Sequence, residues 1–187
     1  MKPTYKDIIK HYEACLEKHG DTNLGVDWPK LEDVDKRYKV MVDIIRVNED
    51  SRNDISLLDF GCGTAHLFEF INKNNLNAIK YSGLDISDKF ISVAQKKYPD
   101  NAFYCGDILD ETFILPSFDY IVMNGVFTEK RNLTFDDMWN YFTEMIAAIF
   151  TKCNVGIAFN VMSKNVDWER DDLFHVPLDL LSSYLCK

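Results

Sequence analysis

The hydrophobic pattern divides the chain into a helical N-terminal part and a longer part in which strands and helices alternate. Apolar residues recur at helical spacing over 4–19 and 31–47, and a loop with several glycines separates the two segments. From residue 55 onward, short apolar runs predict strands and amphipathic segments predict helices. The expected strands are 55–60, 78–86, 101–107, 118–125 and 154–163. The expected helices that follow them are 64–74, 87–98, 134–153 and 177–187.

This alternation predicts the fold class. Strands that alternate with helices form βαβ units, which give a parallel sheet with right-handed crossovers. The expected strands at 118–123 and 155–159 are almost continuously apolar, as they are when helices cover both faces of a sheet. We therefore expect one doubly wound α/β domain over residues 1–187, with the two helices in 1–50 and the sheet in 51–187.

Composition and charge narrow the function classes. A chain of 187 residues suits one domain, and its formal charge of -9 argues against binding to a nucleic-acid backbone. No apolar run is long enough for a membrane span, and the first twenty residues lack the apolar core of a signal peptide, so we expect a cytoplasmic protein. The five cysteines form no CxxC pair, which predicts free thiols and no metal site.

The first expected strand ends in a glycine-rich turn. Ligands of doubly wound sheets bind beyond the carboxyl ends of the strands, so the sequence DFGCGTAH that follows this strand is the first place to search. Gly61 and Gly63 permit a close approach of the backbone to a ligand, and the next helix offers free N–H groups to an anion. A dinucleotide-binding GxGxxG motif would need glycine where His66 stands, which argues against a nicotinamide-dependent oxidoreductase.

The next three strands also end in polar residues. Asp85 follows the second strand, where an acid accepts hydrogen bonds from ribose hydroxyls. Asp107 follows the third strand, where it would accept from an exocyclic adenine amine while Ile108 flanks the ring. Asn124 and Gly125 follow the fourth strand. Each of these features alone is also compatible with a tight turn or a helix cap.

Taken in order, these strand ends resemble the class I S-adenosylmethionine-dependent methyltransferases over about residues 55–162. The similar segments are LLDFGCGTAHL, GLDIS, CGDILD and FDYIVMNGVF, with Ala65 where many members have a third glycine. The resemblance implies S-adenosylmethionine as cofactor and S-adenosylhomocysteine as product. The cofactor-binding residues that it implies, together with Arg37 discussed below, are Asp59, Phe60, Gly61, Cys62, Gly63, Asp85, Ile86, Asp107, Ile108, Asn124, Gly125 and Val126.

The resemblance also assigns roles within this set. Gly61 and Gly63 would let the backbone approach the methionine part of the cofactor, and Asp59 would help to hold its ammonium group. Asp85 would hold the ribose, and Asp107 the adenine.

The N-terminal helices resemble the lid of some small methyltransferases. In that arrangement Arg37 would pair with the methionine carboxylate of the cofactor, although a solvent-facing arginine fits the sequence equally well. Trp28 fits a lid or a core position.

Methyl transfer needs a base only when the acceptor must lose a proton. His175 is the candidate because it is the one histidine after the fifth strand, but a structural histidine is the alternative. We expect a small-molecule acceptor, with no nucleic acid or membrane as partner. The favoured acceptor is an oxygen of a polar metabolite, sugar or carboxylate, as in bacterial surface-polysaccharide pathways. The alternative is a non-catalytic domain that binds the cofactor or a protein.

The C-terminal part departs from the family pattern. Members usually carry two more strands after the fifth, whereas residues 164–187 predict a loop and a helix. We therefore expect the strand order 3-2-1-4-5 without the terminal hairpin. The free edge of the fifth strand would be covered by residues 164–187 or by a partner chain, in a monomer or a homodimer.

Overall fold

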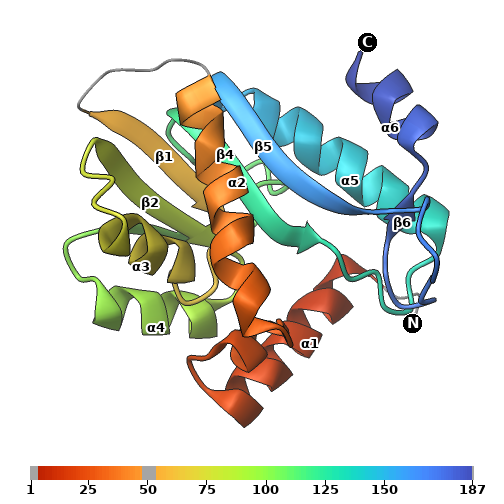
Figure 1. Cartoon of the computed structure of the whole chain (residues 1–187), viewed down its shortest axis with the longest axis horizontal. Coiled ribbons are helices and arrows are strands. Elements are labelled where there is room, and N and C mark those ends of the chain that lie inside the picture. The colour runs from red at the N-terminus through yellow and green to blue at the C-terminus, as the bar shows by residue number, and fades with distance from the viewer. Residues whose placement is uncertain (1–3, 48–53, 187) are drawn as a thin grey trace.

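One parallel sheet with helices on both faces forms the centre of the fold (Figure 1). The computed structural model describes residues 4–47 and 54–186, so the expected boundary between residues 50 and 51 lies outside the described residues. Six strands follow the order β3-β2-β1-β4-β5-β6, and each neighbouring pair is parallel. The strands are β1 Ile55–Phe60, β2 Ile79–Asp85, β3 Ala102–Cys105, β4 Phe118–Phe127, β5 Cys153–Ser163 and β6 His175–Val176. The predicted doubly wound sheet and the order of its first five strands are confirmed.

The helices form two layers and a separate N-terminal element. Helices α2 and α3 pack on one face of the sheet, and α5 packs on the other (Figure 1). Short 3-10 helices, η1 Asn23–Val26 and η2 Leu31–Asp33, lie between α1 and α2. The α-helices are α1 Tyr5–His19, α2 Val34–Val47, α3 His66–Lys73, α4 Asp88–Lys97, α5 Phe135–Phe150 and α6 Leu178–Leu185.

The side chains of β1 alternate between two hydrophobic cores. Leu57 joins Tyr120 and Val122 in the core beneath α2 and α3. Leu58 joins Ile121 in the core beneath α5. Both leucines have an exposed fraction of 0%, and burying each contributes roughly 1.5–3 kcal/mol. A strand that is buried on both faces needs apolar residues at consecutive positions, which explains the pattern of β1 and β4 in the sequence.

Strand β6 is a correction to the sequence analysis. Residues 164–187 contain a short strand as well as the expected loop and helix. It pairs in parallel with the end of β5, with Met162 opposite His175 and Ser163 opposite Val176. A strand of two residues has no periodicity by which the sequence could reveal it. It covers only the last part of the outer edge of β5.

Helix α1 lies at the carboxyl end of the sheet rather than on either face (Figure 1). It ends at Gly20, whose φ of 65° turns the chain back toward the helix. The returning loop packs so closely that a Cβ atom on Gly25 would lie 1.9 Å from the carbonyl oxygen of Gly20. The loop therefore places Asp27 and Trp28 beside α1, at the end of the sheet where a ligand is expected.

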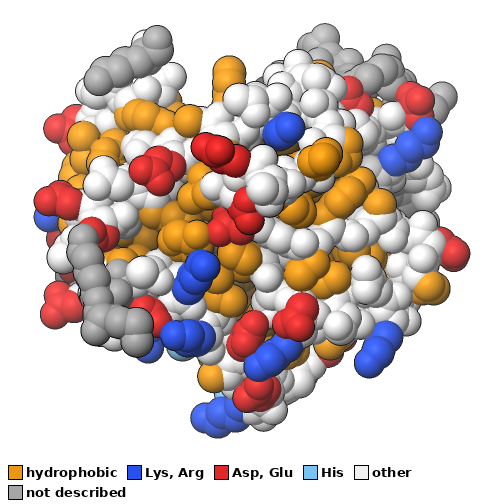
Figure 2. Space-filling model, turned by 180° about the vertical axis from the view of Figure 1, so that it is seen from behind, with side chains coloured by type: hydrophobic (Ala, Val, Ile, Leu, Met, Phe, Trp, Pro, Cys, Tyr) orange, Lys and Arg blue, Asp and Glu red, His pale blue; other side chains and the backbone are white. Residues whose placement is uncertain are grey.

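The surface is mixed in character. Figure 2 shows acidic, basic and apolar side chains interspersed over the face opposite to that of Figure 1. On this face the lysines and arginines do not gather into one continuous patch. None of the described helices has the length and apolar character needed to cross a membrane.

Candidate active site

A cavity with largely apolar walls lies between α1 and the carboxyl ends of β1, β2, β3 and β4. Every cofactor-binding residue predicted after these strands lines it, from Asp59 in β1 to Val126 in β4. Aromatic residues from the N-terminal part and from α5 complete the walls. These are Tyr5, Tyr12, Trp28, Tyr38 and Tyr141. The cavity therefore occupies the place where doubly wound sheets bind their ligands.

The turn after β1 has the left-handed backbone that its glycines predict. Gly61 has a φ of 74° and Gly63 a φ of 53°. A Cβ atom on Gly61 would lie 2.7 Å from Cγ2 of Val126, so any other residue would force the valine to shift. Ala65 has a φ of 66°, so it occupies a position that glycine adopts at lower cost.

Asp59 is a buried carboxylate with one side-chain partner. Its exposed fraction is 4%, and the hydroxyl of Tyr81 donates a 2.9 Å hydrogen bond to its Oδ2 atom. Burial raises the pKa of Asp59 to about 7 against the lowering effect of the Tyr81 bond, and the charge of Asp85 adds to the rise. No lysine or arginine pairs with Asp59 within the described parts of the chain. A positive charge in the cavity would therefore favour the ionised form of Asp59.

Asp85 joins two turns of the site. Its Oδ2 atom accepts a 2.9 Å hydrogen bond from the N–H group of Gly63, and its Oδ1 atom accepts a 3.0 Å bond from that of Ser87. Burial raises the pKa of Asp85, and these backbone hydrogen bonds lower it. The carboxylate therefore holds the glycine turn against the start of α4 and also lines the cavity.

Asp107 is bound by α1. The hydroxyl of Tyr5 donates a 2.6 Å hydrogen bond to its Oδ2 atom, while its Oδ1 atom accepts a bond from the N–H group of Leu109. The Tyr5 ring also stacks on that of Tyr141 at a centroid distance of 4.8 Å. Burial and the bond to Asp107 raise the pKa of Tyr5 to about 12, so this phenol stays protonated and acts as a donor.

An amide pair lies where β4 and β5 meet the cavity. The N–H group of Gly125 donates a 2.8 Å hydrogen bond to Oδ1 of Asn160, which fixes the orientation of that amide. Nδ2 of Asn160 then donates a 3.1 Å bond to Oδ1 of Asn124, which fixes the second amide in turn. Nδ2 of Asn124 is buried and has no hydrogen-bond acceptor among the described residues. The N–H group of Gly125 thus orients both amides, and Nδ2 of Asn124 is a buried donor that a ligand oxygen could accept from.

Two further contacts hold α1 across the cavity. The hydroxyl of Tyr12 lies 3.4 Å from the carbonyl oxygen of Gly125. On the other side Oγ of Ser87 donates a 2.7 Å hydrogen bond to Glu13, which also pairs with Lys89. Helix α1 thus contacts the ends of β3 and β4 and the start of α4.

Two predicted site residues do not line the cavity. Arg37 is exposed, and its guanidinium carbon lies 5.4 Å from the centre of the Trp28 ring. His175 is buried in β6, where Nδ1 contacts the carbonyl oxygen of Ser163 at 2.9 Å and Nε2 accepts a bond from the N–H group of Arg170. Because backbone groups occupy both ring nitrogens, His175 has the geometry of a structural histidine and not of a base.

The sequence analysis missed the side chains of α1 that face the site. Tyr5 and Tyr12 lie on the apolar face of α1, and that face reads in the sequence as an ordinary core stripe. Asn160 lies near the end of the fifth strand, and this position is the signal in the sequence that could have marked it.

Comparisons with known proteins bear on the fold that carries this site. Residues 58–147 match the family model described as a methyltransferase domain. Magnesium protoporphyrin IX methyltransferase from Synechocystis PCC 6803, solved with bound SAH, is similar over 97% of this chain and 87% of that chain, with a TM-score of 0.66 and 13% identity. The SAM-bound structure of that enzyme is similar over 81% of this chain and 66% of that chain, with a TM-score of 0.58 and 14% identity. DesVI from Streptomyces venezuelae is similar over 91% of this chain and 67% of that chain, with a TM-score of 0.53 and 19% identity. The comparison with curated protein sequences gave no match.

Residues 58–147 therefore match a methyltransferase domain, and the chain has the fold of the class I S-adenosylmethionine-dependent methyltransferases. The family resemblance read from the strand ends is confirmed. The chain spans about two thirds of the length of two of the structures above, at 66% and 67%.

Proposed function

We propose that this chain binds S-adenosylmethionine and transfers its methyl group to an oxygen atom of a small molecule. The observation that carries the proposal is the convergence of Asp59, Asp85 and Asp107 on one cavity with apolar walls. The cofactor brings an ammonium group, two ribose hydroxyls and an adenine amine, which are all hydrogen-bond donors. The ammonium group would supply the positive charge that the buried Asp59 lacks.

The protein would bind and orient the reactants rather than react with them. When bound, the cofactor supplies an electrophilic methyl group on a sulfonium centre. Gly61 and Gly63 would let the backbone approach the methionine part of the cofactor, while Asp85 and Asp107 would hold the ribose and the adenine. Helix α1 would exclude water from the reacting atoms, because its aromatic side chains form one wall of the cavity.

The cavity favours an acceptor that is already deprotonated. Its one imidazole among the described residues, that of His66, has Nε2 at 2.8 Å from Asp21 and 3.1 Å from the hydroxyl of Thr64. The His66 ring is therefore occupied by contacts with Asp21 and Thr64, and His175 lies in β6, outside the cavity. A carboxylate needs no base before it accepts a methyl group, so within the expected class of polar metabolites, sugars and carboxylates we favour a carboxylate. The resemblance groups Asn124 with the cofactor-binding residues; we propose instead that its amide donates to one of the carboxylate oxygens of the acceptor.

A titration tests the cofactor. The purified chain would be titrated by calorimetry with S-adenosylmethionine, S-adenosylhomocysteine and a nicotinamide dinucleotide. We expect binding of the first two only. Absence of binding to both would overturn the proposal.

A variant at Asn124 tests the acceptor. Asn124→Ala should raise the KM for a carboxylate acceptor by about 10-fold, since one hydrogen bond to a charged group is lost, and should leave S-adenosylhomocysteine affinity unchanged. The matched control is Asn140→Ala on the exposed side of α5. A loss of S-adenosylhomocysteine affinity instead would assign the amide to the methionine carboxylate of the cofactor. If hydroxyl or amine compounds are methylated in place of carboxylates, the acceptor class is wrong.

The second candidate function is a non-catalytic domain that binds the cofactor or a protein. The observation that favours it is that the one imidazole described in the cavity, that of His66, is held by Asp21 and Thr64, so no histidine there is free to act as a base. Cofactor binding without methylation of any carboxylate, hydroxyl or amine compound that is tested would support this reading.

A further inference from the structure

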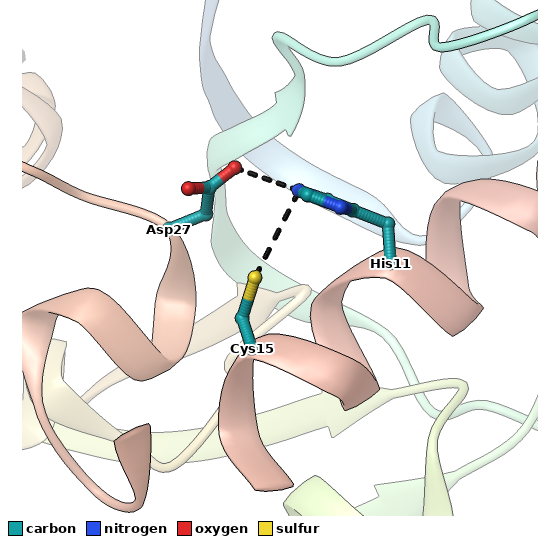
Figure 3. Close-up of side chains that lie close together, drawn as sticks. All are labelled: His11, Cys15 and Asp27. Atoms are coloured by element: carbon teal, nitrogen blue, oxygen red, sulfur yellow. Dashed lines mark hydrogen bonds and ion pairs between the residues drawn. The ribbon is translucent and has the colours of Figure 1, made fainter. Parts of the chain in front are cut away.

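Three side chains of different chemistry converge outside the cavity, between α1 and the loop that follows it (Figure 3). His11 and Cys15 stand one helical turn apart on the same face of α1, and Asp27 lies on the loop opposite them. Nε2 of His11 lies 2.7 Å from Oδ2 of Asp27 and 3.9 Å from Sγ of Cys15. One ligand atom from each of the three side chains lies within 4.8 Å of the other two.

We propose that His11, Cys15 and Asp27 form a binding site for Zn²⁺ or a similar transition-metal ion. This site is independent of the proposed methyl transfer. Imidazole, thiolate and carboxylate groups are the ligands that zinc takes in proteins, whereas calcium and magnesium prefer oxygen ligands alone.

The distances suit such an ion after a small adjustment. In a tetrahedral zinc site a nitrogen and a sulfur ligand lie about 3.6 Å apart, and a nitrogen and an oxygen ligand lie about 3.3 Å apart. The corresponding distances here are 3.9 Å and 2.7 Å. The nitrogen–oxygen pair would have to move apart and the nitrogen–sulfur pair closer together, and rotation about the side-chain bonds allows both shifts. The side chains of His11 and Asp27 are 22% and 37% exposed, so an ion has a path from solvent.

The surroundings of the three side chains favour a cation. Glu129 lies nearby with an exposed fraction of 6%, and its pKa is raised by burial and, among other charges, by that of Asp27. Arg131 is paired with Glu129 and with Asp172. Within the described ranges, no lysine or arginine pairs with Asp27. Arg170 is likewise paired with Asp172, so the nearby arginines neutralise other carboxylates and leave Asp27 with His11 as its ion-pair partner.

A second cluster shows the contrast. Asp21, His66 and Glu69 also place their polar atoms within 4.8 Å of one another. There, however, the ammonium group of Lys97 lies 2.7 Å from Asp21 and 2.5 Å from Glu69, and it fills the position that a metal ion would take. We therefore assign a metal site to the first cluster and not to the second.

A bound ion would join α1 to the loop that carries Trp28. Trp28 lines the cavity, and its ring lies 3.5 Å from the position of a Cβ atom on Gly125. The ion would thus fix the position of one wall of the cavity from outside.

Metal titration of the full chain tests the site. After treatment with a chelator and a reductant, the protein would be titrated with Co²⁺ and then with Zn²⁺. We expect one equivalent of Co²⁺ to give the thiolate charge-transfer absorption of a Co–S bond and Zn²⁺ to displace it. Cys15→Ser should abolish this absorption and weaken zinc binding by about 100-fold or more, because even groups that only orient a ligand contribute about 10–100-fold.

Matched variants separate this site from other metal binding. Cys186→Ser removes an exposed thiol, and Asp21→Asn alters the second cluster, so both should keep the one-to-one stoichiometry. Asp27→Asn, which keeps the size of the side chain, should weaken zinc binding even if Cys15→Ser does not fold. The proposal is overturned if the wild-type chain takes up no stoichiometric metal, or if Cys15→Ser and Asp27→Asn bind it as the wild type does.

Discussion

The hydroxyl of Tyr5 donates a 2.6 Å hydrogen bond to Asp107 and so joins the first turn of α1 to the end of β3. Asp107 is also the residue that the family resemblance assigns to the adenine amine. A carboxylate oxygen that holds Tyr5 is less available to a ligand, because the hydrogen bond must be shared or broken. Tyr5 of α1 and the adenine amine of the proposed cofactor would therefore compete for the carboxylate of Asp107.

Tyr5→Phe should therefore tighten the binding of S-adenosylhomocysteine. The competing hydrogen bond contributes about 1–1.5 kcal/mol, which corresponds to an affinity increase of up to about 10-fold. Calorimetric titration of both proteins measures it. The matched control is Tyr184→Phe, which removes a 2.9 Å hydrogen bond to the carbonyl oxygen of Thr143 outside the cavity. Weaker binding by Tyr5→Phe would show that the tyrosine holds the cofactor instead.

Asp59 should make the protein less stable as the pH rises toward neutrality. Its folded pKa of about 7 lies above the ordinary value of 3.8, so between these values the unfolded chain is ionised while the folded chain keeps its proton. The favourable contribution is complete below pH 3.8 and is lost as the pH rises to about 7. Integrated over this interval, the loss is on the order of 4 kcal/mol.

Asp59→Asn should remove this dependence. The free energy of unfolding in urea, measured for both proteins at several pH values, should fall more steeply for the wild type between pH 3.8 and about 7. Because the ionised carboxylate would hold the ammonium group, S-adenosylhomocysteine should bind more tightly as the pH rises through about 7, and Asp59→Asn should bind it weakly at every pH. Parallel pH profiles for the two proteins would contradict this assignment.

The fold was predictable where the sequence has a clear period. The apolar runs of β1 and β4 and the amphipathic helices specify a doubly wound sheet, because few other arrangements bury such elements. Strand β6 was not predictable, since two residues carry no period and their pairing with β5 depends on the path of the preceding loop.

Only the site residues that the sheet contributes were predictable from the sequence. Asp59, Asp85 and Asp107 each follow a strand directly, and parallel strands bring their carboxyl ends together. The contacts of α1 depend on how a helix docks across that edge, which no local pattern records. For His175 the sequence suggested a role that its surroundings do not support. Its place after the fifth strand suggested a catalytic base, whereas both of its ring nitrogens contact backbone groups, as in a structural histidine.

Asp85→Ala should weaken cofactor binding on the order of 2 kcal/mol, because the ribose would lose its hydrogen-bond acceptor. The structure adds a second effect, since Asp85 also accepts bonds from the N–H groups of Gly63 and Ser87. The variant should therefore unfold at lower urea concentration as well. Titration with S-adenosylhomocysteine well below the unfolding transition separates the two effects. Wild-type affinity under those conditions would remove Asp85 from the cofactor site.

His175→Ala should destabilise the fold without changing the chemistry. The ring accepts a bond from the N–H group of Arg170 and contacts the carbonyl oxygen of Ser163, so its removal leaves two backbone groups without partners at a cost of about 1–3 kcal/mol. Urea unfolding measures this loss. His19→Ala, whose side chain lies at the end of α1, should change stability by less than about 0.5 kcal/mol. The methylation rate per folded molecule of His175→Ala, with an acceptor that the wild type methylates, should equal that of the wild type. A rate that falls with unchanged stability would restore His175 as the base and would require β6 to move toward the cavity during turnover.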